Sequence, residues 1–489
     1  MKILKKESDD ILVIASPREM VRVGDYLVAS EPQRSLVLQV YDERYLDVEG
    51  IEEEIAREEV LSASAPGVTS DPTELTTIST IIRDMRILLC KARGTISDGR
   101  LTPRANWMPS RASSTVTRLL IEDLAGAVAP LGIRNIKLGT VDGESSFGVP
   151  AEALDGRITV ITGRKESGKS HMAKILLRGL LENGAYSVVF DLNDEYGTIG
   201  QLGDGTDAGQ GRKVRVMRPG RELKFSLASM GLRPITSLLS HSLEMPGTSL
   251  REFVKIWEHL DNRDELSLAT LEAAIQQWRC NEFVRDALFA RYHTLASCGL
   301  FTDSSHQQFD VQDFFNLNRS GGVLVVSLSG VSPLNRKMVV ELMLSKLVEL
   351  LERRKIPPVF LFAEEAHLYL RDTYWEDLIT RMRHFGVFTV FVTNQPDAID
   401  QKIYRQVDNI FLYNFSNDSD LALVSQASMA DADTVKAIVR TLPPRMCLLL
   451  GYAVRNLPVV VSVDPFDSPA SGATRRFFAD SIEVGPAAR

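Results

Sequence analysis

The chain has 489 residues, of which 44% are hydrophobic and 25% charged, a composition typical of a soluble globular protein with about two to four domains. Its 56 basic and 64 acidic residues give a net charge of −8, which excludes nucleic-acid binding over the whole surface. Any DNA contact therefore requires basic residues gathered in one place. No apolar run reaches the ~18 residues of a membrane span, no secretory leader opens the sequence, and the four cysteines are scattered, so we expect a cytoplasmic protein without a zinc site.

The first 150 residues favour β-structure. Short β-prone runs occupy 21–30, 35–42 and 84–93, with turn-forming residues between them. We therefore expect a small β-barrel domain over 1–150. The acidic stretch 43–60 is either the solvated face of a helix or a docking patch for a partner protein.

From Arg157 onward, strands and helices alternate. An apolar strand at 157–162 precedes a helix over 169–184, which ends at Asn183-Gly184. Further strands are expected at 186–197, 322–330, 357–365, 386–396, 409–415, 446–452 and 458–463. This alternation predicts the α/β class, with a parallel-rich sheet that binds ligands at the carboxyl ends of its strands.

We place this α/β core at 151–465. Helical periodicity without strand signals runs from about 222 to 300, and it predicts a helical insertion in the core. Residues 466–489 are polar and small, as expected of a C-terminal tail.

Residues 163–170 read GRKESGKS, between the apolar strand and the helix. A glycine-rich loop that enters a helix N-terminus turns its backbone N–H groups inward, where they bind phosphate. In this pattern the lysine reaches the β- and γ-phosphates and the serine hydroxyl ligates Mg²⁺. The candidate nucleotide-binding residues are Gly163, Arg164, Lys165, Glu166, Ser167, Gly168, Lys169, Ser170 and His171. Glu166 adds a negative charge beside a polyanion, so we expect it at the outer rim of a cradle of modest affinity.

A second motif, VFLFAEEAH at 359–367, places two acids at the end of an apolar strand. Adjacent carboxylates there are costly unless they serve a cation or a proton transfer. We expect Glu364 to hold Mg²⁺ through water and Glu365 to polarise the attacking water. The alternative is a charged helix start, in which both glutamates face the positive end of the helix dipole.

Three further polar residues follow or precede the next strand. Gln395 comes directly after FVTN and is a candidate sensor of the γ-phosphate. Arg381 and Arg383 precede that strand; they are candidates for stabilising charge at a neighbouring subunit's nucleotide, or else surface arginines on a helix. His171 and His367 are interpreted as packing residues beside the two motifs.

These motifs, in the order GRKESGKS, VVFDLNDEYG, VVSLSG, FLFAEEAH, VTNQP and LPPRMCLLLG, resemble the HerA branch of the HerA/FtsK P-loop ATPases over about 150–463. Three positions differ from the usual family pattern. Glu166 stands where glycine is common, Pro396 where an arginine usually follows the glutamine, and Arg445 where glycine often follows the double proline.

The resemblance implies a RecA-like P-loop ATPase core, a small N-terminal β-barrel and a homohexameric ring with ATP and Mg²⁺ at the subunit interfaces. It also implies double-stranded DNA in a central pore and a partner docked on the barrel, either a NurA-like nuclease or an antiphage defence effector. Candidate DNA contacts in the pore loops are Arg371, Arg212 and Lys213.

Three functions remain open from the sequence. The first is an ATP-driven DNA translocase or helicase that works with a nuclease in DNA end processing or antiphage defence. The second is a ring scaffold that assembles and activates an effector, with nucleotide setting its geometry. The third is a secretion or conjugation ATPase.

Overall fold

The computed structural model describes residues 1–46, 82, 84–103, 107–127, 132–143, 145–206, 213–370, 382–415, 417–427 and 430–467. The acidic stretch from residue 47 onward and the predicted tail from 468 lie outside this range. The chain forms two compact units. The first holds 1–131, 139–147 and 412–463, and the second holds 132–138, 148–411 and 464–489. The three-domain division expected from the sequence stays a prediction.

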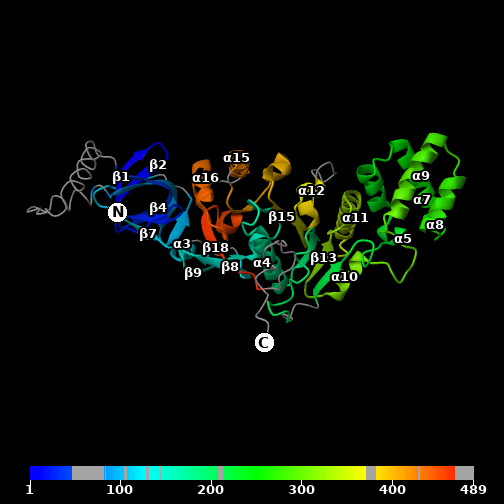
Figure 1. Ribbon diagram of the computed structural model, residues 1–489. Helices are drawn as coiled ribbons and strands as arrows, with labels where there is room; N and C mark the ends of the chain where they lie inside the picture. Colours follow the sequence, from blue (N-terminus) through cyan, green and yellow to red (C-terminus); the bar gives the residue numbers. More distant parts are fainter. Residues whose placement is uncertain are drawn as a thin grey trace, which may run out of the picture. The chain divides into compact units, whose positions relative to one another are not determined.

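The first unit contains a curled antiparallel sheet, in the strand order β1-β2-β5-β4-β3-β7 (Figure 1). Its strands are β1 (Lys2–Glu7), β2 (Asp10–Ala15), β3 (Tyr26–Ser30), β4 (Arg34–Tyr45), β5 (Arg86–Ser97) and β7 (Thr115–Leu119), with β6 (Arg100–Thr102) paired to β5. Two register shifts between the long strands β4 and β5 bend the sheet around an apolar core. The Lys2 ammonium of β1 donates a hydrogen bond of 3.1 Å to the carbonyl of Ser114, the residue that precedes β7. The expected barrel is therefore present as a half-barrel.

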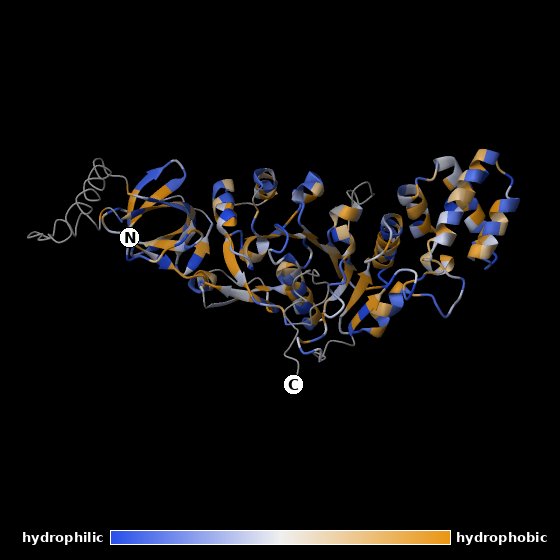
Figure 2. Ribbon diagram, viewed as in Figure 1, coloured by the Kyte–Doolittle hydropathy of each residue, from blue (hydrophilic) through white to orange (hydrophobic). Residues whose placement is uncertain are grey.

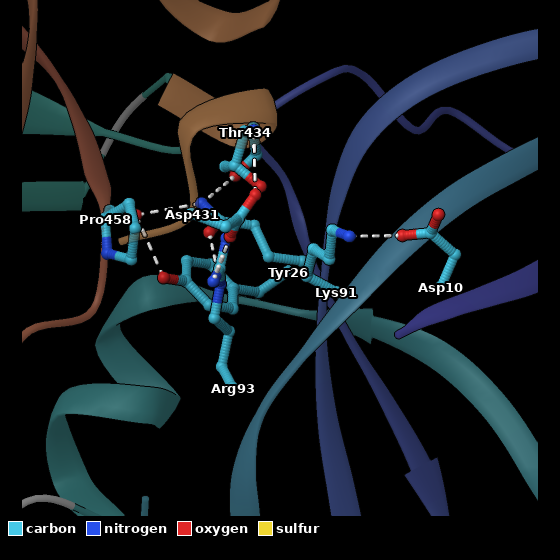
Figure 3. Close-up of polar contacts among 9 residues, drawn as sticks. Asp10, Tyr26, Lys91, Arg93, Asp431, Thr434 and Pro458 are labelled. Carbon is cyan, nitrogen blue, oxygen red and sulfur yellow. Dashed lines mark hydrogen bonds and ion pairs between the residues drawn. The ribbon is translucent and has the colours of Figure 1, made fainter. Parts of the chain in front are cut away.

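The same unit includes an antiparallel set formed by β17 (Met446–Gly451), β18 (Val459–Val463) and the end of β8 (Asn135–Val141) from residue 139 onward. Its helices are α3 (Ile121–Ala127), α15 (Asp418–Ala427) and α16 (Ala432–Thr441). Figure 3 shows how the half-barrel is joined to this C-terminal part of the unit. The Arg93 guanidinium donates to Asp431 at 2.7 Å and to the Thr434 hydroxyl at 2.8 Å, and the Tyr26 hydroxyl donates to the Pro458 carbonyl at 2.9 Å.

The second unit is built on parallel strands in the order β12-β13-β11-β14-β15-β10. They are β12 (Val214–Met217), β13 (Gly322–Ser327), β11 (Tyr186–Asp191), β14 (Val359–Glu364), β15 (Val387–Thr393) and β10 (Thr159–Thr162); β16 (Asn409–Leu412) and β9 (Ser145–Pro150) lie where the chain passes between the units. Every residue of β13, β14 and β15 is buried, and Figure 2 shows the core strands in the orange of apolar residues. The predicted parallel-rich α/β sheet is confirmed.

Helices cover this sheet, among them α4 (Lys169–Glu182) and α11 (Pro333–Glu352), with shorter helices α10 (Val311–Leu317), α12 (His367–Leu370) and α14 (Gln401–Tyr404). Helix α4 ends as expected, with Asn183 as C-cap and Gly184 at φ 80°. Among the described residues, no helix combines the length and the apolar character needed to cross a bilayer.

The predicted helical insertion is formed by α5 (Leu227–Met230), α6 (Leu232–Ser237), a π-helical turn (Leu238–Ser242), α7 (Gly247–Asp261), α8 (Leu268–Gln277) and α9 (Glu282–Ser297). The N-cap side chains Ser267 and Asn281 start α8 and α9. Helices α7, α8 and α9 pack together, each with an apolar and a polar side (Figures 1 and 2).

Candidate nucleotide-binding site

The predicted phosphate loop connects the buried strand β10 to the N-terminus of α4. Gly168 is the N-cap of α4 and has φ 116°, a conformation that only glycine adopts without strain. This turn aims the first free N–H groups of the helix into the loop. Lys169 is buried, and its ammonium donates a hydrogen bond to the Arg164 carbonyl at 2.8 Å. The lysine thus lies across the loop, as the sequence pattern requires.

Two hydroxyls of this region are buried without a hydrogen-bond partner among the described residues. They belong to Thr162, the last residue of β10, and to Ser167 in the loop. Buried polar groups are rarely left unsatisfied unless they serve a ligand. Orphaned hydroxyls beside inward-facing N–H groups fit a bound phosphate.

Glu166 occupies the rim of the loop, as expected. Its side chain is exposed, as are those of Arg164 and Lys165 on either side. The backbone of Glu166 has φ 62°, in the left-handed region that costs an L-residue about 1–2 kcal/mol. The glycine usual at this position would adopt it without that cost, so the substitution adds both strain and charge to the loop.

The two predicted acids lie at the carboxyl end of β14. Glu364 is 3% exposed, and its Oε2 atom has no hydrogen-bond partner within the described ranges. Burial and the nearby charges of Glu195 and Asp191 raise its pKa well above the ordinary value. Glu365 follows at φ 46°, with its N–H bonded to the Val392 carbonyl at 2.7 Å. A buried carboxylate oxygen without a hydrogen-bond partner is the kind of ligand that a hard cation such as Mg²⁺ prefers.

Strand pairing brings the loop and the acids to one edge of the sheet. In the register, Thr162 of β10 pairs with Thr393 of β15, and Glu364 of β14 pairs with Val392 of the same strand. Electrostatics agrees with this placement. Burial lowers the pKa of Lys169, while the charges of Glu365, Glu195 and Glu364 oppose that shift. The lysine and the acids therefore share one buried site.

The turn after β11 contributes an acid that we did not assign from the sequence. The Asp191 carboxylate accepts three backbone N–H groups, from Asn193, Glu195 and Tyr196, at 2.9 to 3.2 Å. Burial raises the pKa of Asp191, and the N–H donors oppose this shift. The turn holds Glu195 at 3.6 Å from the Lys174 ammonium on α4. The sequence does show a polar run directly after an apolar strand. It does not show that Asp191 accepts the backbone N–H groups of the turn while Glu195 faces the site.

The candidate sensor lies at the same edge. Gln395 is exposed, and its N–H bonds the Thr393 hydroxyl at 3.0 Å. Its neighbour Asn394 has a buried Oδ1 atom with no hydrogen-bond partner in the described chain.

The other candidates lie elsewhere. Arg383 precedes β15 and forms an ion pair with Asp408 at 3.5 Å, so it lies at the amino edge of the sheet, opposite the phosphate loop. Lys213 precedes β12 and occupies the same amino edge. Arg381, Arg371 and Arg212 fall outside the described residues. The roles of all five arginines and lysines stay predictions, as do those of Ser170 and of His171, which is exposed on the first turn of α4.

Comparison with known proteins finds one matching family and several relatives. The family described as "Helicase HerA, central domain" matches residues 159–347, which include the phosphate loop. The "DNA double-strand break repair helicase HerA" of Sulfolobus acidocaldarius is 21% identical over 413 residues, covering 79% of this chain and 78% of the relative. The protein of that name from Saccharolobus solfataricus is 23% identical over 370 residues, covering 69% of this chain and 70% of the relative.

A solved structure supports the fold. The bacterial conjugative coupling protein TrwB matches 68% of this chain and 90% of its own, with a TM-score of 0.50 and 14% identity. At that identity the likeness concerns the fold alone.

Proposed function

We propose that this chain is a HerA-type P-loop ATPase and that it acts as an ATP-driven DNA translocase or helicase, a proposal that the family match and the two curated relatives support. The main support for the proposal is that the phosphate loop and the two acids Glu364 and Glu365 lie at the same edge of the sheet. This is the arrangement that nucleoside triphosphate hydrolysis needs: a cationic cradle for the phosphates opposite a base for water.

The chain's own groups divide the work as follows. The loop N–H groups and Lys169 bind the β- and γ-phosphates. Ser170 and the orphaned oxygen of Glu364 would hold Mg²⁺, which when bound offsets negative charge on the phosphate oxygens. Glu365 orients the attacking water and accepts its proton. Glu195, positioned by the turn that Asp191 caps, adds negative charge that favours the protonated form of Lys169.

The finer parts of the proposal concern assembly. Arg383 lies at the edge of its sheet opposite the loop, which suits a group that reaches a neighbouring subunit's nucleotide rather than its own. We assign this role to Arg383 or Arg381, in a homohexameric ring around duplex DNA, with Gln395 as the sensor of the γ-phosphate. We also propose that a nuclease or a defence effector docks on the half-barrel.

Steady-state ATP hydrolysis with and without duplex DNA tests the main proposal. The wild type is expected to hydrolyse ATP faster when duplex DNA is present. Lys169→Ala should lose both rates, whereas Lys355→Ala, which removes an exposed lysine of the same unit, should keep them. A wild-type rate that is identical with and without DNA would instead favour the scaffold function.

A further inference from the structure

We propose that Arg215, Arg218, Arg221 and Lys224 form a contact surface for the phosphate backbone of duplex DNA, here called the β12 basic surface. The inference rests on the proposed DNA translocase function and assigns DNA contacts that the sequence motifs did not indicate. Within 215–224 there are four cationic side chains and a single acid, in a chain whose net charge is −8. This local excess is what a chain of negative net charge needs to bind a polyanion.

Contacts between their segments place these four residues close together. The Arg215 guanidinium lies 5.0 Å from the centre of the Phe309 ring. The N–H of Phe309 bonds the Lys224 carbonyl at 2.7 Å, and the neighbouring Leu223 N–H bonds the Arg218 carbonyl at 3.0 Å. Arg221 lies inside the turn that this last bond closes.

The backbone that carries the surface is firmly anchored. Leu223 and Phe225 are fully buried, with exposures of 0% and 1%. Phe225 exchanges backbone hydrogen bonds with Leu300 and Thr302, at 2.8 and 2.9 Å. Because the turn is ordered before any ligand binds, its exposed arginines pay little backbone entropy when they contact phosphate.

The cations are available for a ligand. Arg215, Arg218 and Arg221 are exposed, and no ion pair within 4.0 Å involves any of the four in the part of the chain that the structure describes; the Lys224 ammonium donates a hydrogen bond to Gln307 at 3.4 Å. The single acid, Glu222, accepts a hydrogen bond from the backbone N–H of Arg218 at 3.1 Å; backbone hydrogen bonds and the charges of Arg218 and Arg221 lower its pKa, so it offsets part of the positive charge of the surface. Some other exposed arginines, among them Arg233 and Arg440, are paired with acids.

The position connects this surface with the nucleotide site. The turn at 218–224 follows the carboxyl end of β12, so it lies at the same edge of the parallel sheet as the phosphate loop and Glu364. Strands β13 and β11 separate β12 from β14, a span of about 14 Å at the usual strand spacing. DNA held here would lie close to the acids that act on the nucleotide.

Equilibrium binding of a fluorescent duplex of arbitrary sequence, measured from 50 to 200 mM salt, tests the inference. Each phosphate contact contributes about 0.9 to the slope of log K against log salt, so Arg218→Gln with Arg221→Gln should reduce the slope by about 1.8 for each protomer that contacts the duplex. The matched control is Arg263→Gln with Arg279→Gln, which removes two exposed charges from the insertion and should keep the wild-type slope. Thermal unfolding reports whether both variants are folded.

The outcomes separate this inference from the proposed function. Equal slopes for the wild type and both double variants would overturn the β12 basic surface and leave the translocase proposal standing. A wild type that binds no duplex at 50 mM salt would overturn both.

Discussion

The strained and charged position of Glu166 gives a quantitative prediction for nucleotide affinity. Its side chain is exposed at the rim of the phosphate loop, and its φ is 62°. Two substitutions separate the two effects. Glu166→Gln removes the charge and keeps the strain, whereas Glu166→Gly removes both.

The charge effect follows from Coulomb's law. Two unit charges about 8 Å apart in water repel by roughly 0.5 kcal/mol, so a carboxylate facing a nucleotide complex with about two net negative charges costs about 1 kcal/mol. Both variants should therefore bind ATP roughly fivefold more tightly than the wild type. Glu166→Gly also relieves backbone strain of about 1–2 kcal/mol, and the greater freedom of glycine in the unfolded chain takes back about 0.5–1 kcal/mol of that gain. This variant alone should therefore have a slightly higher melting temperature.

Titration with a fluorescent ATP analogue measures these affinities at low and at high salt. The gain should shrink as salt screens the exposed charge. If both variants bind the analogue no more tightly than the wild type at low salt, Glu166 does not face the nucleotide and the electrostatic reasoning fails.

The remaining predictions concern the stability of the first unit. Gly94→Ala should lower the melting temperature, because the added Cβ would lie 2.5 Å from the Thr102 carbonyl oxygen and overpacking of this kind costs about 1–3 kcal/mol; a melting temperature equal to that of the wild type would contradict the close strand approach. Asp431→Asn should keep the N-cap of α16 and lose only the attraction to Arg93, whereas Asp431→Ala should be less stable by about 1 kcal/mol more, measured by denaturant unfolding; equal losses would refute the capping role. Burial raises the pKa of Asp431, but the charge and hydrogen bonds of Arg93 and Thr434 outweigh this effect and bring the pKa below the ordinary 3.8. The stability advantage of the wild type over Asp431→Asn should therefore be complete above about pH 4 and decline as the pH falls through the lower folded pKa; an advantage that shows no decline below about pH 4 would show that it does not come from this carboxylate.

The elements that the sequence predicted best are those with the strongest patterns. The buried strands β13, β14 and β15 are continuous apolar runs, and α11 has a long helical period, so burial and sequence agree. The acids at the end of β14 were also predictable, because a carboxylate buried after an apolar strand is costly unless it binds a cation or takes part in a proton transfer.

Other features depend on tertiary context. Strand β1 reads KILKKE and strand β12 reads VRVM beside several cations, so neither has the pattern of a buried strand; both are held by pairing on a single side at a sheet edge. The grouping of 412–463 with the half-barrel rests on contacts between residues far apart in the sequence, such as those of Arg93 with Asp431 and Thr434, more than three hundred residues away.

The candidate site shows the same division. The sequence indicated the loop, Glu364, Glu365 and Gln395, because each stands at the end of an apolar strand. It did not separate the roles of Asp191 and Glu195, because only the folded turn shows which carboxylate accepts the backbone N–H groups.

The central claim is that Glu365 activates water at a nucleotide held by the loop around Lys169. Single-turnover hydrolysis of radiolabelled ATP by Glu365→Gln, with bound ATP quantified in the same samples, tests it most directly. The variant is expected to bind ATP as the wild type does and to hydrolyse it about a hundredfold to ten-thousandfold more slowly, the usual contribution of a general base. Hydrolysis at the wild-type rate with ATP fully bound would contradict the assignment.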